Sequence, residues 1–182
     1  MEQTAERSLR PLFWALIRIG FGLNIGLFGI LQIDLLPAFL GYWTVGEQMR
    51  AFPEYPWPRW FGKALGLAAL ASLLAWFPLV QAAVPAWTLT AVSLTQTALN
   101  AAVYYHVAGL LIFLSGAHGR LDLAENGRRF RRVFLIPYVL LSVISVLRGG
   151  VMDFWYALAL IFQMALIVYA ANCDRALTPR EE

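Results

Sequence analysis

The feature that most constrains this chain is a long internal stretch without a charged side chain. Residues 64–119, between Lys63 and Arg120, contain no Asp, Glu, Lys or Arg. Soluble domains carry charged residues at about a quarter of their positions, whereas here the fraction over the whole chain is 14%. A transmembrane helix needs about 20 predominantly apolar residues, so this stretch is long enough for more than one crossing. The sequence therefore predicts an all-α fold, a polytopic membrane helix bundle.

The apolar segments divide into six predicted transmembrane helices within one integral membrane domain, residues 1–182. As a single helix, residues 79–117 would be about 58 Å long, nearly twice the hydrocarbon thickness of a bilayer. We therefore expect two crossings there, with a break between Thr97 and Ala101, where Asn100 is the best turn residue. The predicted crossings cover residues 11–33, 60–77, 79–97, 101–117, 133–148 and 154–172.

Arginines orient the predicted bundle. The connector at residues 118–132 contains five of the 14 basic residues, and positively charged connectors lie on the cytoplasmic side of a membrane. Six crossings then put both termini in the cytoplasm and the loop at residues 34–59 on the outer side. The expected location is the cell (inner) membrane, with the lipid bilayer as the first partner. The net charge of +3 is explained by this orientation and by contact with anionic lipids, so no nucleic-acid partner is expected.

The loop at residues 34–59 is rich in aromatic residues and proline, and two interpretations of it remain open. It is either an ordinary interfacial aromatic belt with a stiff connection or a lid over a lipid-side pocket. A short surface-lying or re-entrant segment near residues 35–46 fits either interpretation.

Small and polar residues predict how the helices associate. Gly22–Gly26 and Gly62–Gly66 are GxxxG pairs, which permit close helix packing, self-association or contact with other membrane subunits. A polar stripe follows one helical face and is expected to face other helices, because lipid would exclude it. This stripe consists of Thr90, Ser93, Thr97 and Asn100.

Candidate residues for chemistry are few, and catalytic residues cannot be assigned. His106 and Lys63 are weak catalytic candidates, because ionisable groups inside a membrane are often functional. His106 would suit axial ligation of a chlorin or haem, but a hydrogen-bonded histidine within the bundle explains it equally well. Tyr104, Tyr105, His106 and Trp43 are the predicted cofactor-binding residues. No metal site is expected, and no nucleotide-binding, metalloprotease or hydrolase motif is present.

Three segments resemble a known membrane family. FWALIRIGFGL (residues 13–23) is similar to the first helix of the HTTM family, the membrane domain shared with vitamin K-dependent gamma-carboxylases. AVYYHVAGLLIFLSGAHGRLDL (residues 102–123) resembles a later helix of that family, and DoxX-like quinone-associated proteins end a helix similarly. FQMALIVYAAN (residues 162–172) also resembles an HTTM segment. The resemblance implies a helix bundle that binds a quinone or another isoprenoid lipid, and it carries no carboxylase activity to this chain.

Three classes of function follow. The first is an HTTM/DoxX-like protein that binds a quinone or other isoprenoid lipid, with His106, Tyr105 and Lys63 near an outer-leaflet pocket. The second is a non-catalytic accessory or assembly subunit of a larger respiratory or photosynthetic membrane complex. The third is a transporter, which the lack of paired intramembrane charges disfavours. The lipid-binding bundle is the preferred interpretation, and whether it is an enzyme stays open.

Overall fold

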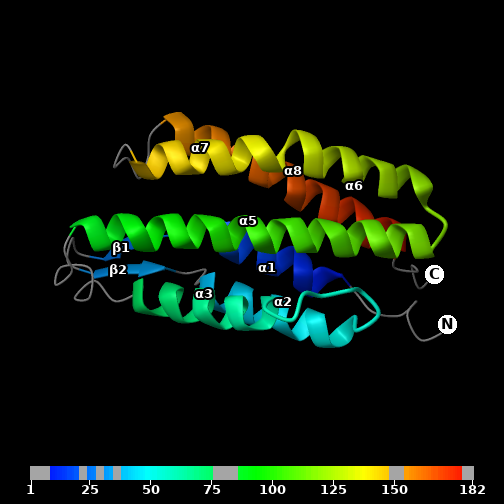
Figure 1. Ribbon diagram of the computed structural model, residues 1–182, viewed down its shortest axis with the longest axis horizontal. Coiled ribbons are helices and arrows are strands. Elements are labelled where there is room, and N and C mark those ends of the chain that lie inside the picture. Colours follow the sequence, from blue (N-terminus) through cyan, green and yellow to red (C-terminus); the bar gives the residue numbers. More distant parts are fainter. Residues whose placement is uncertain are drawn as a thin grey trace.

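The fold is predominantly helical, as the sequence predicts. The computed structural model describes residues 9–20, 24–27, 31–34, 38–75, 86–147 and 154–177. Figure 1 shows long helices lying side by side, with one short hairpin among them. The elements in chain order are α1 (Arg10–Gly20), β1 (Asn24–Leu27), β2 (Leu31–Asp34), α2 (Ala38–Ala51), α3 (Phe61–Ala75), α5 (Ala86–Ala117), α6 (Leu121–Val133), α7 (Leu135–Leu147) and α8 (Phe154–Leu177).

The longest element, α5, overturns one prediction. The expected break between Thr97 and Ala101 is wrong, because residues 86–117 form one continuous helix. The segment contains no proline after its start and no glycine before Gly109, so nothing in its backbone forces a turn. Asn100 stays helical, and its side chain bonds to a neighbouring helix instead of initiating a turn. At about 1.5 Å per residue, α5 is about 48 Å long.

The predicted first crossing, residues 11–33, is also wrong as a single helix. Helix α1 ends at Gly20, and β1 and β2 then pair antiparallel with Leu27 opposite Leu31. The chain therefore reverses direction inside the segment. Glycines at 20, 22, 26 and 29 explain the loss of helix, since each costs about 1 kcal/mol relative to alanine in a helix. Gly22 lies outside the described residues, so the Gly22–Gly26 packing pair stays a prediction.

Two segments predicted as connectors contain helices. Within the loop at residues 34–59, α2 occupies the interval between Pro37 and Pro53, so the prolines flank a helix there. Within the connector at residues 118–132, α6 buries Ala124, Gly127 and Phe130, which recur every three residues on one face. Asp122 in its first turn and two arginines in its last turn complement the helix dipole.

The other predicted helices agree more closely with the structure. Helices α3 and α7 lie within residues 60–77 and 133–148, and α8 begins at Phe154 as expected but extends beyond residue 172 to Leu177. Among the described residues, one helical stretch, Thr90–Ala117, is long and apolar enough to cross a membrane, and half of its most apolar window is buried. A shorter apolar helix covers Phe61–Leu73.

Helix α5 lies at the centre of the bundle. It packs against α3 on one side and against α6, α7 and α8 on the other, whereas α1 packs against α2 and α8. Figure 1 shows this arrangement, with α5 running the full length of the molecule. The start of α1 is joined to the end of α8, because the Leu9 backbone N–H donates to Asp174 Oδ1 at 3.0 Å. The first and last described helices therefore begin and end at the same end of the bundle.

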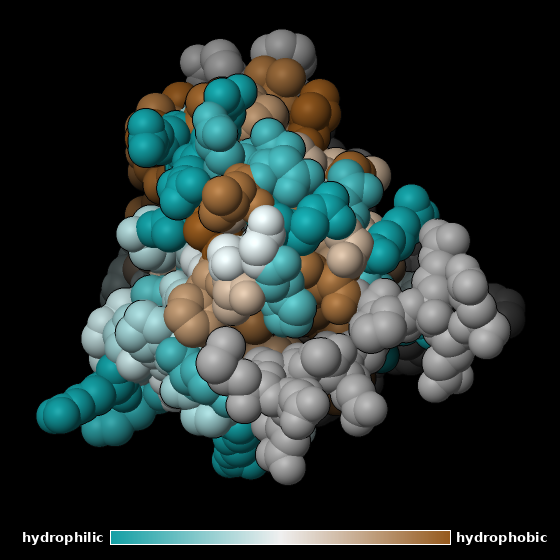
Figure 2. Space-filling model, turned by 90° about the vertical axis from the view of Figure 1, so that its right-hand side faces the viewer, coloured by the Kyte–Doolittle hydropathy of each residue, from teal (hydrophilic) through white to brown (hydrophobic). Residues whose placement is uncertain are grey.

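Charged residues gather at that same end. Four helical segments that run toward the opposite end contain no charged residue: 64–75 of α3, 86–117 of α5, 135–147 of α7 and 154–173 of α8. Figure 2 views the charged end, where hydrophilic side chains (teal) cover much of the visible described surface. The proline-rich segment at residues 52–60 also lies there, since the Tyr55 ring contacts the Phe113 ring near the end of α5, with centroids 5.9 Å apart.

This last contact contradicts the predicted placement of the two connectors on opposite faces of the bundle. Residues 52–60 and the start of α6 lie at the same end. The parity of the prediction fails because it divided α5 into two passes and counted residues 11–33 as one pass, whereas the chain reverses at the hairpin and not within α5.

A polar cluster joins α2 to α5 and confirms part of the predicted polar stripe. The Tyr42 hydroxyl donates to Asn100 Oδ1 and accepts a hydrogen bond from Gln96 Nε2. Tyr42 is only 1% exposed, and Thr97 on the same helix is also buried. The polar face of α5 therefore contacts other helices at Asn100 and Thr97.

Tyr42→Phe is expected to destabilise the protein by about 1–3 kcal/mol, because it leaves two side-chain amides without their shared partner. Unfolding in detergent micelles, followed by circular dichroism, measures this difference. Thr95→Val is the control, since the Thr95 hydroxyl bonds only to the Ala91 carbonyl on an exposed surface. We expect the control to change stability by less than about 0.5 kcal/mol. Equal effects of the two changes would contradict a structural role for the cluster.

Candidate functional site

The turn between α5 and α6 determines which residues of the two helices meet. Gly119 adopts a left-handed backbone conformation, with φ of 72°. The Arg120 N–H donates to the Ser115 carbonyl at 2.9 Å, and the Gly119 N–H donates to the Gly116 carbonyl at 3.1 Å. These two bonds form a Schellman motif, in which glycine provides the left-handed residue that ends a helix. Helix α6 therefore folds back along α5.

In such a helical hairpin, residues equally distant from the turn face each other. Tyr105 lies 14 residues before Gly119 and Arg131 lies 12 residues after it, so the two are brought together. The Arg131 guanidinium carbon lies 3.7 Å from the centre of the Tyr105 ring. This cation–π contact contributes about 0.5–2 kcal/mol, more where water is excluded. It fixes the orientation of one arginine against α5.

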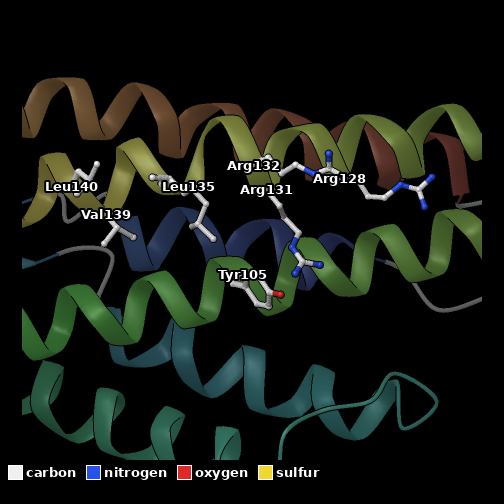
Figure 3. Close-up of a pocket in the computed structure, with 8 residues that line it drawn as sticks. Tyr105, Arg128, Arg131, Arg132, Leu135, Val139 and Leu140 are labelled. Carbon is white, nitrogen blue, oxygen red and sulfur yellow. The ribbon is translucent and has the colours of Figure 1, made fainter.

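Beside this contact lies an open cavity of about 680 Å³, which we call the α5–α7 groove. Figure 3 shows Arg131 reaching toward Tyr105, with Arg128 and Arg132 further along α6 and aliphatic side chains along α7. The groove is thus cationic at one end and apolar at the other. Its lining residues are Tyr105, Arg128, Arg131, Arg132, Leu135, Ile136, Val139 and Leu140.

Helical periodicity explains why these residues share one surface. Residues 128, 131, 132, 135 and 139 follow spacings of three and four, which is one face of a helix. Helices α6 and α7 are separated only by Phe134, whose N–H donates to the Phe130 carbonyl at 2.9 Å, so the face continues from one helix to the next. From residue 128 to residue 140 it extends about 18 Å.

The arginines of this region differ in their partners. Arg129 pairs with Glu125 at 2.6 Å, and Arg120 pairs with Asp122 at 3.1 Å. The Arg120 hydrogen bond also lowers the pKa of the Asp122 carboxyl below its usual value. For Arg128 and Arg132, no carboxylate of the described residues lies within ion-pairing distance. The groove therefore carries positive charge that the described part of the chain does not neutralise.

The structure separates the predicted cofactor-binding residues. Tyr104, Tyr105 and His106 are consecutive on α5, and successive residues of a helix point in directions about 100° apart. Tyr104 is buried against Tyr138 of α7, with ring centroids 5.1 Å apart. Tyr105 faces α6, and His106 faces the opposite side. Of the three, only Tyr105 lines the α5–α7 groove.

His106 lies among aromatic rings. Its ring centroid is 4.7 Å from that of Phe61 and 6.4 Å from that of Trp57, which itself stacks on Phe61. His118, the other histidine, lies 12 residues further along the chain, and its Nδ1 is 2.8 Å from the Leu114 carbonyl oxygen. At about 1.5 Å per residue the two histidines are about 18 Å apart along α5, too far to ligate the same metal. This surrounding favours the structural interpretation of His106 over the ligand interpretation.

Trp43 and Lys63 lie away from both Tyr105 and the groove. Trp43 on α2 is exposed and lines a second cavity, of about 350 Å³, between α2 and α3. Gly62 and Gly66 also line it, and a Cβ atom added at either glycine would meet nothing within 4 Å. Lys63 is exposed on α3. The predicted pocket formed by Lys63, His106 and Tyr105 is therefore not assembled.

The residues that sequence reasoning missed are the arginines and aliphatic residues of the groove. The cluster at positions 128–132 was interpreted as a signal of orientation only, because its segment was taken as a loop. The spacing of Arg128, Arg132 and Leu135 on one helical face is the signal that could have identified the site.

Comparisons with known proteins found no matching family model, no similar curated protein and no similar solved structure. The resemblance to HTTM and DoxX-like proteins therefore stays a prediction, and the function has to be argued from the geometry.

Proposed function

We propose that this chain is a small integral membrane protein that binds a quinone or another isoprenoid lipid in the α5–α7 groove. The observation that carries the proposal is the polarity of the groove, in which arginines occupy one end and aliphatic side chains the other. A headgroup at the arginine end and an apolar tail along α7 would match both halves. No catalytic step is assigned.

The charge-free half of the bundle supports membrane embedding. Residues 86–105 of α5 extend about 30 Å, the hydrocarbon thickness of a bilayer, and residues 154–173 of α8 have a similar length. Large apolar side chains are exposed along these helices, which is unfavourable in water and favourable in lipid. The most exposed of them are Leu67, Trp87, Ile136, Leu147 and Ile161, between 60% and 73%.

The described elements support six passes with different boundaries from those predicted from sequence. The passes are α1 with β1, β2 with α2, α3, α5, α6 with α7, and α8. Because the basic residues gather at one end, the positive-inside rule orients that end, and with it the start of α1 and the end of α8, toward the cytoplasm. Residues 52–60 are then cytoplasmic, and the groove opens at the boundary between the cytoplasmic leaflet and the charged end.

The proposal is tested by removing the apolar half of the groove. Ile136→Ala/Leu140→Ala is expected to lower the amount of lipid that stays bound to the purified full-length protein by about tenfold, since two aliphatic contacts with the tail are lost. Native mass spectrometry in a neutral detergent, followed by extraction and identification of the bound lipid, measures this retention.

Leu67→Ala/Leu70→Ala is the matched control. These residues lie on α3, outside the groove, and are 63% and 53% exposed, against 60% and 58% for Ile136 and Leu140. Bound lipid should be unchanged in this control. If both pairs reduce lipid equally, the lipid is held by the apolar exterior in general and the proposed site is wrong.

A second candidate function is that of an accessory subunit of a larger membrane complex. The open glycine face of α3 beside Trp43 favours it, because exposed GxxxG surfaces pack closely against other membrane helices. The same preparation distinguishes the candidates, since stable co-purification of other subunits without a retained lipid would favour this second function.

A further inference from the structure

We infer that the lipid held in the α5–α7 groove carries an anionic phosphate headgroup, bound by Arg128 and Arg132. This inference rests on the proposed function and narrows its ligand class, since a quinone headgroup is uncharged. It follows from three observations: the arginines without an acidic partner, their position on one helical face, and the apolar groove that continues from them.

The first observation is the charge at the head of the groove. Three arginines line it, and no acidic residue does. Arg131 is engaged by the Tyr105 ring, whereas Arg128 and Arg132 have no carboxylate of the described residues within ion-pairing distance. Neighbouring arginines do have such partners, as Arg129 pairs with Glu125. Positive charges concentrated at a membrane boundary favour an anion, and arginine binds phosphate through two parallel hydrogen bonds.

The second observation is the geometry of the pair. Arg128 and Arg132 are four residues apart on α6, so their side chains emerge from the same helical face about 6 Å apart. Figure 3 shows Arg128 and Arg132 on α6 above the groove, and Arg131 directed downward to Tyr105. A tetrahedral phosphate offers several oxygen acceptors and can contact both guanidinium groups together. Arg131, held against the aromatic ring, forms the floor next to them.

The third observation is that this cationic head opens directly into an apolar channel. Leu135 follows Arg131 and Arg132 by three or four residues, and Val139 follows Leu135 by four, so the aliphatic wall begins one helical turn after the arginines. A free phosphate ion would use only the arginine end. A phosphate attached to an apolar tail uses the whole length of the groove, and we therefore assign the anion to a lipid headgroup.

The test uses two lipids that share one tail. Geranylgeranyl phosphate and geranylgeraniol differ only in the phosphate, and each is titrated into the full-length protein in a neutral detergent, with inorganic phosphate as a separate competitor. We expect geranylgeranyl phosphate to bind at least about tenfold more tightly, since charge-assisted hydrogen bonds are added. Its affinity should fall with rising salt, whereas inorganic phosphate at the same concentration should not displace it.

Arg128→Gln/Arg132→Gln is expected to remove most of this preference while leaving geranylgeraniol binding unchanged. Arg129→Gln is the matched control on the same helix, because Arg129 pairs with Glu125 and does not line the groove; it should change the preference by less than about twofold. Both arginines of the double variant are exposed, so folding should be retained, and the single variants Arg128→Gln and Arg132→Gln provide a second measurement.

The possible results separate the two proposals. Equal binding of the two lipids, unchanged in the double variant, would overturn the phosphate assignment and leave the lipid-binding function standing. Displacement of the phosphorylated lipid by inorganic phosphate would overturn the assignment to a lipid headgroup. Binding of neither lipid would overturn both the assignment and the proposed function.

Discussion

Cysteines introduced at positions 54 and 126 are expected to react with a membrane-impermeant maleimide from the same side of the membrane. In a Cys173→Ala background, Glu54→Cys and Asn126→Cys should both be unreactive in intact cells and become labelled after permeabilisation. The reason is that residues 52–60 contact the end of α5 beside the turn into α6, at the basic end that the positive-inside rule orients to the cytoplasm. The labelled fraction in cells and in permeabilised cells measures the difference.

Trp87→Cys provides the opposite reference. Trp87 is 73% exposed at the start of α5, one charge-free length of about 30 Å from Tyr105, so it should be labelled in intact cells. If position 54 were labelled in intact cells while position 126 was protected, the two connectors would lie on opposite sides. That result would restore a reversal between residues 79 and 117 and overturn the six passes proposed above.

The sequence predicted the helical class and the extents of α3 and α7 because uninterrupted apolar composition decides those helices locally. It could not predict that α5 is continuous, since a 32-residue helix and two short crossings have the same composition. The difference lies in a tertiary interaction: Tyr42, 58 residues earlier in the chain, bonds to the Asn100 side chain. The amide that looks like a turn residue in isolation thereby becomes part of a helix interface.

The reversal inside residues 11–33 was missed for a different reason. Glycines at regular spacing suit a tightly packed membrane helix, and they equally weaken a helix enough for a hairpin to replace it. Local pattern does not distinguish the two outcomes, because packing of the neighbouring segments decides between them.

The candidate site was only partly predictable. Tyr105 was identified correctly as a residue of interest, but its assumed partners His106 and Tyr104 diverge from it around the helix. Its actual partner, Arg131, follows from measuring equal distances on either side of Gly119 once both flanking segments are taken as helices. The sequence therefore contained the contact, and the mistaken assignment of residues 118–132 as a loop concealed it.

Gly41→Ala is expected to lower the free energy of unfolding by about 1–3 kcal/mol, because the added methyl group overpacks the interface of α1 and α2. A Cβ atom there would lie 2.7 Å from Ile19 Cγ1 and 2.8 Å from the Ala15 carbonyl oxygen. The second neighbour is backbone and cannot rotate away, so the two helices would have to separate. Because α1 also packs against α8, the disturbance should reach the end of the bundle at which Asp174 accepts its hydrogen bond from Leu9.

Gly46→Ala is the matched control, being the same change five residues later on the same helix. Nothing lies within 4 Å of a Cβ atom added there, so only the helix propensity changes, and stability should rise by up to about 1 kcal/mol. Thermal unfolding of both variants in the same detergent measures the two shifts, which are predicted to have opposite signs. A stabilising Gly41→Ala would mean that α1 and α2 do not approach each other through this glycine, and α1 would then have to pack elsewhere in the bundle.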